Sequence, residues 1–196
     1  MPDPYPYQIA GATALTRHRN FILADEMGLG KTCQAIIACD RILADRVMCI
    51  VPAALRENWR REFATWSVRN LDIRIIRSVK EAEAWAEAGA TGDVVIISYD
   101  LAASKHGYPV LTSAGRFDVL ICDEAHYLKS AASRRTRTVL GTHNIKGSFR
   151  EISDRAWMLT GTPMPNNPLE LYPILKAFGL WRDSKIQFLD TFCIHY

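Results

Sequence analysis

The segment FILADEMGLGKT, residues 21–32, has the composition of a phosphate-binding loop. A short apolar run comes first, a loop with two glycines follows, and Lys31 and Thr32 stand where a helix is expected to begin. Backbone N–H groups of such a loop and the dipole of the helix attract an anion, and Gly28 and Gly30 let the backbone approach it. Lys31 would reach the β- and γ-phosphates, and the Thr32 hydroxyl would bind Mg²⁺.

The loop departs from the usual pattern G-x-x-x-x-G-K-[ST] at its first position, which is Asp25. A strict search for that pattern would miss this site. The alternative interpretation is an ordinary turn between a strand and a helix, with a solvated lysine. We favour the phosphate site because the loop stands between an expected strand and an expected helix.

A second segment whose side chains could carry out chemistry is FDVLICDEAH, residues 117–126. Asp123 and Glu124 follow the apolar residues Val119–Cys122, so they are expected at the carboxyl end of a buried strand, where ligands of open α/β sheets bind. Asp123 could hold Mg²⁺ through its waters, and Glu124 could orient and deprotonate an attacking water. The alternative is that the two acids only cap the next helix. We favour the hydrolytic interpretation because a phosphate loop lies upstream.

Positioning these groups requires a sheet, and short apolar runs predict one. Most runs are continuously apolar and rich in Val and Ile, which is typical of parallel strands buried on both faces. Helix-like segments alternate with them, so the predicted fold class is α/β, a doubly wound parallel sheet with helices on both faces. The expected strands are Phe21–Ala24, Val47–Val51, Ile73–Ile76, Val94–Ser98, Val119–Cys122 and Trp157–Thr160.

Helices are expected between the strands. The first of them would place Ile36, Ile37 and Leu43 on one side, and the second has Leu55, Trp59 and Phe63 at four-residue spacing. The expected helices are Lys31–Ala44, Ala54–Trp66, Glu81–Ala88, Arg134–Leu140 and Leu169–Phe178, the last ended by Gly179. Two segments rich in Gly, Ser and Thr, Ser104–Arg116 and Gly141–Asp154, are expected to be loops.

Composition narrows the class of protein. The 196 residues carry 24 basic and 21 acidic side chains, a net charge of +3, which excludes a histone-like basic protein. No apolar run approaches a membrane span, and the N-terminus lacks a secretory signal. Five cysteines without C-x-x-C spacing argue against disulfides and zinc ribbons. We expect a protein that is not secreted: cytoplasmic in a bacterium or phage host, or nuclear in a eukaryote. Cys33 is interpreted as a small packed residue; the alternative is a reactive thiolate.

Taken together, these motifs resemble a known family over nearly the whole chain. DEMGLGKT and the DEAH box are similar to the RecA-like P-loop domain of superfamily 2 helicases, and Asp in the first position resembles the Swi/Snf-type ATPases. Four further stretches are similar, in the family's order: YPYQIAGA, VPAALRENWRREFATW, VVIISYD and LTGTPMPNNPLELY. Pro163-Met164-Pro165 and the compact spacing resemble the annealing-helicase-like or bacterial and phage members.

The resemblance implies a DNA-dependent ATPase in which ATP hydrolysis drives movement on duplex DNA, with ATP and Mg²⁺ bound. Lys31 and Glu124 would be catalytic, and Asp123 with Thr32 would hold the metal. Adenine would be read by Gln8. The phosphates would be wrapped by Asp25, Glu26, Met27, Gly28, Leu29, Gly30, Lys31 and Thr32. Coupling between ATP and DNA would involve His126, Thr160, Gly161 and Thr162.

Basic side chains near the expected strand ends are candidates for contacts with DNA phosphates. They are Arg56, Arg60, Arg61, Lys129, Arg134, Arg135 and Arg137. With Glu57 and Glu62 nearby, the first three could equally form a solvated helix face. The five tryptophans are interpreted as packing residues and not as platforms for bases.

The resemblance also predicts the organisation of the chain. Residues 1–180 would be the first RecA-like lobe, and 181–196 a helical end leading to a second lobe outside this sequence. That lobe would supply an arginine finger worth about 10³–10⁵ in rate. We therefore expect weak binding and slow hydrolysis of ATP by this chain. The alternatives are a non-catalytic, nucleotide-responsive binding module and an RNA-directed lobe of the same superfamily.

Overall fold

In the computed structural model of this chain, which describes residues 2–141, 147–164 and 166–193, six strands form one sheet. The strand order is β1-β6-β5-β2-β4-β3, and every neighbouring pair is parallel. The strands are β1 (Asn20–Leu23), β2 (Val47–Val51), β3 (Ile73–Ile75), β4 (Val94–Ser98), β5 (Phe117–Asp123) and β6 (Ser153–Leu159). The predicted fold class is confirmed.

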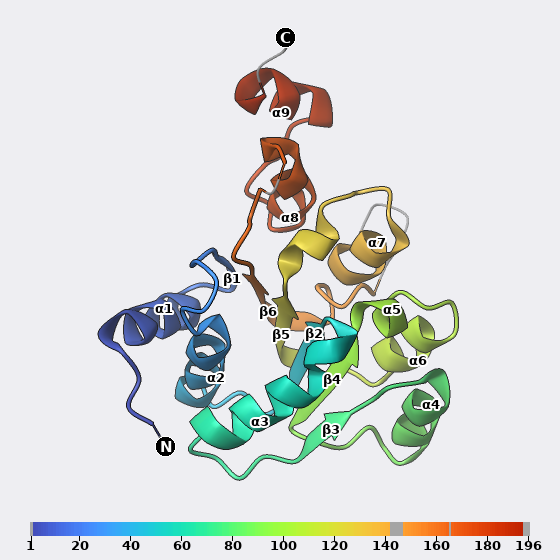
Figure 1. Cartoon of the computed structure of the whole chain (residues 1–196). Coiled ribbons are helices and arrows are strands. Elements are labelled where there is room, and N and C mark those ends of the chain that lie inside the picture. The colour runs from blue at the N-terminus through green and yellow to red at the C-terminus, as the bar shows by residue number, and fades with distance from the viewer. Residues whose placement is uncertain (1, 142–146, 165, 194–196) are drawn as a thin grey trace.

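Both faces of this sheet are buried, as the apolar runs predicted. Every residue of β2 and β4 is buried, and successive side chains of β2 enter two different cores. Helices α1 (Pro6–Arg17), α2 (Lys31–Arg41) and α3 (Arg56–Trp66) cover one face (Figure 1). The other face is covered by α4 (Val79–Glu87), α5 (Tyr99–Ala102), α6 (Gly107–Ser113) and α7 (Arg134–Leu140), and α8 (Tyr172–Ala177) packs against α7.

One helix ends earlier than expected. The first predicted helix, Lys31–Ala44, stops at Arg41, and the prediction that Leu43 lies on its apolar side is wrong. Leu43 is 71% exposed and has a φ of 53°, because the chain reverses there to enter β2. A left-handed backbone at this residue ends the helix and turns its side chain to solvent.

The predicted loop Ser104–Arg116 is also wrong, since it contains α6. Gly, Ser and Thr favour a loop by composition, but the Ser104 hydroxyl accepts a bond from the Gly107 N–H at 2.7 Å, and Leu111 is fully buried. Burial of Leu111 in the core therefore outweighs the preference of Gly, Ser and Thr for a loop. Of the other predicted loop, Gly141–Asp154, residues 142–146 lie outside the described part, and its last two residues belong to β6.

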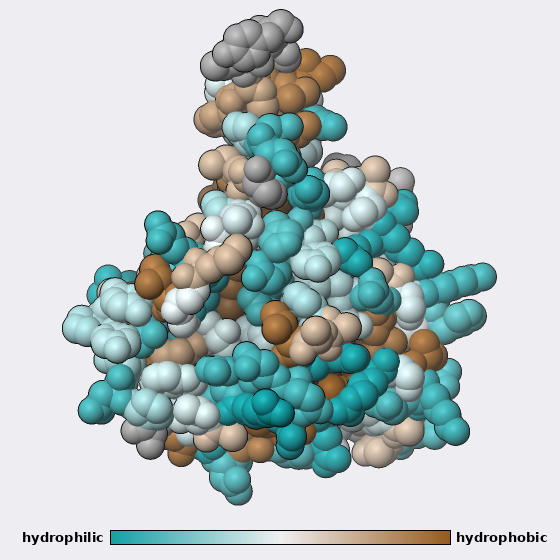
Figure 2. All heavy atoms as spheres, viewed as in Figure 1, coloured by the Kyte–Doolittle hydropathy of each residue, from teal (hydrophilic) through white to brown (hydrophobic). Residues whose placement is uncertain are grey.

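The last helical segments project from the sheet, at the top of Figure 1. They comprise η3 (Pro168–Leu171), α8 and α9 (Lys185–Phe192), and Figure 2 shows hydrophobic residues gathered there, Leu180, Ile186 and Phe192 being at least half exposed. The domain boundary at residue 180 stays a prediction, and Pro165 and residues 194–196 lie outside the described part. None of the described helices has the length and apolarity that crossing a membrane requires.

At the amino-terminal ends of the strands, Arg46 joins the loops that precede β2, β4 and β5. Its guanidinium donates to the carbonyls of Arg116 at 3.0 Å, Ala114 at 3.0 Å and Ala90 at 3.3 Å. The same group lies 4.8 Å from the centre of the Phe117 ring. A planar fork is needed to reach three carbonyls and a ring at once, and an ammonium lacks that geometry.

We therefore expect Arg46→Lys to lower the free energy of unfolding by about 1–3 kcal/mol, as measured by urea denaturation. Arg74→Lys is the matched control, because Arg74 only pairs with Asp72 on the exposed surface. That substitution should change the free energy by less than about 0.5 kcal/mol. Equal losses in the two variants would contradict the structural role of Arg46.

Candidate functional site

Three of the predicted functional segments meet at one edge of the sheet because β6 lies between β1 and β5. Leu159 of β6 is level with Leu23 of β1 on one side and with Asp123 of β5 on the other. The Thr160 N–H donates to the Leu23 carbonyl at 3.1 Å, which holds the end of β6 against the end of β1. The phosphate loop, the acidic pair and Thr160–Thr162 therefore border one site.

The phosphate loop depends on two glycines for different reasons. Gly28 and Gly30 have φ angles of 80° and 70°, which favour glycine. A Cβ on Gly30 would lie 2.4 Å from Nε2 of Gln8, so the loop is also pressed against α1 there. A Cβ on Gly28 would meet nothing within 4 Å. Gly28 is needed for its backbone conformation, and Gly30 for both conformation and close approach.

Lys31 opens α2 and folds over the loop. Its Nζ donates to the carbonyls of Asp25 at 2.8 Å and Glu26 at 2.9 Å. An ammonium has three N–H donors, and in the described part of the chain no acceptor takes the third. Nζ also lies 3.5 Å from where a Cβ on Gly161 would stand, so the charge sits between the loop and the end of β6. The Lys31 ammonium is therefore well placed to donate to a phosphate oxygen. Thr32, the next residue, is half-buried.

Gln8 lies beside the same loop. Its Oε1 accepts a bond from the Tyr5 N–H at 2.9 Å, and its Nε2 is 3.5 Å from the Leu29 carbonyl. The rings of Tyr5 and Tyr7 stack with centroids 5.7 Å apart, and both are exposed. The adenine-reading role of Gln8 stays a prediction.

Asp123 is buried, and both of its carboxylate oxygens have donors. The Trp59 indole N–H donates to Oδ2 at 2.8 Å, and the Glu124 N–H to Oδ1 at 2.9 Å. The Tyr99 hydroxyl donates to its main-chain carbonyl at 2.7 Å. Burial raises the pKa of Asp123, while the Trp59 and Glu124 donors and the charge of Lys31 lower it.

Glu124 occupies a strained backbone position. Its φ of 50° is left-handed, which costs a residue with a side chain about 1–3 kcal/mol, and such strain is concentrated at functional sites. The chain turns there from β5 into the short helix η2 (Ala125–Leu128). Oε2 of Glu124 lies 3.1 Å from Nδ1 of His126, and both side chains are about 30% exposed. The turn therefore sets where the carboxylate and the imidazole stand.

Arg135 contacts the aromatic residues that support this turn. Its guanidinium lies 4.9 Å from the Tyr127 ring centre and 5.6 Å from that of Tyr99, and the two rings stack at 5.3 Å. It also donates to Asp100 at 2.7 Å. The sequence suggested Arg135 only as a DNA contact, and sequence reasoning missed Tyr99. Trp59 was interpreted only as a packing residue, although its indole N–H reaches Asp123.

The remaining candidate DNA contacts differ in their surroundings. Arg60 pairs with Glu57 at 3.0 Å, and Arg77 pairs with the same carboxylate, as a solvated helix face would. These two arginines lower the pKa of Glu57, the Arg60 hydrogen bond most. Lys129 lies 3.3 Å from Glu170. Arg56 donates to the Ala53 carbonyl at 3.0 Å, whereas the side chains of Arg61, Arg134 and Arg137 are exposed and have no protein acceptor among the described residues. All remain predictions as DNA contacts.

The donor set fits a magnesium ion that is shared with a nucleotide. Within the described residues, no group of three or more His, Cys, Asp or Glu side chains could hold a metal by itself. Mg²⁺ commonly binds through one or two protein oxygens, several waters and substrate phosphates. The Thr32 hydroxyl and the Asp123 carboxylate are protein oxygens of this kind.

Cys33 follows Thr32 but does not behave as a reactive thiol. Its side chain is 2% exposed, and burial, with a smaller contribution from Glu62, raises its pKa to about 11. The thiol therefore stays protonated near neutral pH, so the interpretation of Cys33 as a packed residue is confirmed.

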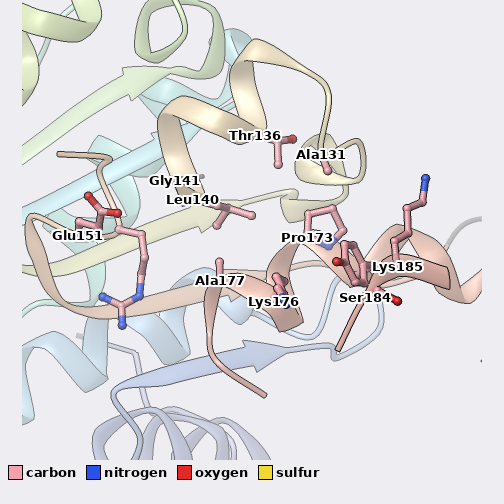
Figure 3. A pocket seen from close by; sticks show the side chains of 12 residues that line it. Ala131, Thr136, Leu140, Gly141, Glu151, Pro173, Lys176, Ala177, Ser184 and Lys185 are labelled. Carbon is pink, nitrogen blue, oxygen red and sulfur yellow. The ribbon is translucent and has the colours of Figure 1, made fainter. Parts of the chain in front are cut away.

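A separate cavity lies between α7, α8 and α9 (Figure 3). Leu140, Pro173 and Ala177 lie along it, with Glu151 at one end and Lys185 at the other. None of its lining residues belongs to the phosphate loop, the acidic pair or Thr160–Thr162. The cavity is therefore distinct from the site at the sheet edge.

The chain is similar to known proteins over most of its length. Residues 7–186 match the SNF2-related domain family. ATP-dependent helicase fft3 of Schizosaccharomyces pombe is 36% identical over 162 residues, which cover 79% of this chain and 17% of the relative. DNA annealing helicase and endonuclease ZRANB3 of Bos taurus is 32% identical over 188 residues, which cover 91% of this chain and 16% of the relative. The chain thus spans less than a fifth of these curated relatives.

A solved structure shows the same fold. The Sulfolobus solfataricus SWI2/SNF2 ATPase core in complex with dsDNA superposes with a TM-score of 0.77. The sequence identity is 22%, and the match covers 98% of this chain and 39% of the other. At this identity the likeness establishes the fold alone.

Trp59→Phe tests the bond between the indole and Asp123. Because this bond favours the ionised carboxylate, its loss should raise the pKa of Asp123 further and lower the free energy of unfolding by about 2 kcal/mol near neutral pH. The loss should shrink as the pH falls through the pKa of Asp123, since a protonated carboxyl gains less from the donor. Urea denaturation near neutral pH and at successively lower pH values measures both effects.

Trp157→Phe is the matched control, because Trp157 is equally buried but its indole lies 3.4 Å from a neutral acceptor, the His18 carbonyl. Its effect on unfolding should not depend on the ionisation of Asp123. If both variants lost the same free energy at every pH, the proposed effect of Trp59 on Asp123 would be wrong.

Proposed function

This chain belongs to the SNF2-related domain family, and we propose that it is the ATP-binding lobe of a DNA-dependent ATPase that moves along duplex DNA. One observation carries the proposal: β6 lies between β1 and β5, so the phosphate loop, Asp123–Glu124 and Thr160–Thr162 border one site. Hydrolysis requires the phosphate loop and the acidic pair together, and Thr160–Thr162 would couple it to movement.

Each group has a task that its surroundings support. Lys31 donates a hydrogen bond to the terminal phosphates, and the loop amides bind the phosphate oxygens. Thr32 and Asp123 would hold Mg²⁺, which would neutralise phosphate charge when it is bound. Glu124 accepts the proton of the attacking water. Its carboxylate is partly exposed and held by the strained turn, so it can face a water.

In this proposal, His126 and Thr160–Thr162 couple hydrolysis to DNA. His126 lies 3.1 Å from Glu124, and Gly161 packs beside Lys31 and Met27. The Thr160 hydroxyl accepts a bond from the Thr162 N–H at 3.1 Å, which fixes the turn after β6. A change at the phosphates would reach both segments through direct contact.

Duplex DNA is the proposed partner because the structural neighbour was solved with dsDNA and basic side chains follow two of the strand ends. Relatives extend well beyond this segment, so we propose that a second lobe completes the site with an arginine finger. Without it, hydrolysis by this chain should be slower by about 10³–10⁵ than by a two-lobe protein.

Lys31→Ala should weaken the binding of Mg·ATP to this chain at least about tenfold, because a charged donor to the phosphates is lost. Titration with a fluorescent ATP analogue measures the effect. Lys80→Ala on α4, away from the loop, is the control and should leave affinity unchanged. Undiminished affinity in Lys31→Ala would argue against a nucleotide site at this loop.

Glu124→Gln, in a protein that carries both lobes, should bind Mg·ATP normally and lose at least about 10²-fold in turnover. Full turnover would show that Glu124 does not activate water. Stimulation of the unsubstituted two-lobe protein by duplex DNA, single strands or RNA identifies the partner. Stronger stimulation by RNA would favour the RNA-directed alternative, and nucleotide binding without hydrolysis would favour the non-catalytic module.

A further inference from the structure

Gln34 is a fully buried polar residue on the first turns of α2, directly beneath the phosphate loop. Its Nε2 lies 2.8 Å from Oδ2 of Asp25 and 3.2 Å from the Leu29 carbonyl. The two acceptors come from the first and fifth residues of the loop. One amide group therefore holds the first and fifth residues of the loop at a fixed separation.

The orientation of the amide follows from these neighbours. A carboxylate and a carbonyl both accept hydrogen bonds, so only the NH₂ end of Gln34 can face them. Its Oε1 then points to α1, where it is buried and has no hydrogen-bond partner among the described residues. An unpaired buried oxygen is costly, and it is tolerated here because Nε2 has a partner for each of its hydrogens.

Gly11 makes room for this arrangement. A Cβ on Gly11 would lie 1.7 Å from Oε1 and 2.8 Å from Cδ of Gln34. Glycine in the middle of a helix is unfavourable, so its presence at this point of α1 is explained by the amide that packs against it. Any side chain at position 11 would push Gln34 away from Asp25 and Leu29.

We propose that Gln34 is a positioning residue that sets the shape of the phosphate loop by bridging Asp25 and Leu29. The proposal deepens the function proposed above and rests on it. Gln34 does not touch the nucleotide; it acts through the loop backbone, whose amides bind the phosphates.

This role accounts for the departure of the loop from the usual pattern. Glycine at the first position has no side chain that could accept a bond from Gln34, whereas Asp25 provides a carboxylate at 2.8 Å. The bridge also reaches Gln8, the predicted adenine-reading residue, because Gln8 faces the Leu29 carbonyl at 3.5 Å. A carbonyl oxygen has two lone pairs and can take both donors.

The test is a double-mutant cycle with Gln34→Met, Asp25→Ala and the double variant in this chain. Met matches Gln in length but makes neither hydrogen bond. Affinity for Mg·ADP, measured with a fluorescent analogue, should fall about tenfold (about 1.4 kcal/mol) in each single variant. Because both substitutions break the same bridge, the double variant should lose about as much as one single variant, not a hundredfold.

Amide exchange of residues 26–30 without nucleotide gives a second readout. Exchange should be at least tenfold faster in Gln34→Met than in the unsubstituted chain. Gln187→Met is the matched control, because Gln187 occupies the third position of α9, where it pairs with Ser184 far from the loop. It should change neither affinity nor exchange at the loop.

The outcomes separate the two proposals. If the unsubstituted chain does not bind Mg·ADP, the proposed function fails, and loop exchange alone decides the role of Gln34. If it binds, but Gln34→Met matches it in affinity and exchange, the positioning role is overturned. Losses that multiply in the double variant would also overturn it, since Asp25 and Gln34 would then act independently.

Discussion

The parallel pairing of β1, β6 and β5 is the constraint on which the site depends. Apolar residues bury both faces of the sheet, so polar groups that must meet a ligand are confined to the strand ends. Each of these three strands is followed at its carboxyl end by one of the polar groups of the site. Because β6 is in register with both neighbours, Lys31, Asp123 and Gly161 come together although they lie far apart in the sequence.

Several groups around that edge are in energetically unfavourable states that fix the shape of the site. Asp123 is buried with its pKa raised, Glu124 has a left-handed backbone, and Gln34 leaves an oxygen unpaired. Each is a local cost that packing elsewhere offsets. In each case the neighbouring donors or turns leave a single arrangement of the group. The common result is a site whose shape is set by the protein before any ligand arrives.

Much of this could be predicted from the sequence, for a physical reason. Strands buried on both faces have uninterrupted apolar runs, and for this reason Val47–Val51 and Val94–Ser98 were predicted to the residue. The phosphate loop and the acidic pair are local patterns and were equally visible. What the sequence could not show is contact between distant segments. The bond from Trp59 to Asp123 joins residues 64 positions apart, and the order of β1, β6 and β5 exists only after folding. Helix α6 was missed because burial of Leu111 outweighs a loop-like composition.

In the proposed function, three segments that are separate in the sequence form one nucleotide site. A titration of the ¹⁵N-labelled chain with Mg·ADP, followed by NMR, distinguishes one shared site from separate ones. Amide signals of residues 25–32, 123–126 and 160–162 should shift together with one dissociation constant, while those of α4 and α9 should not. Shifts confined to one of the three segments, or centred on the cavity between α7, α8 and α9, would contradict it.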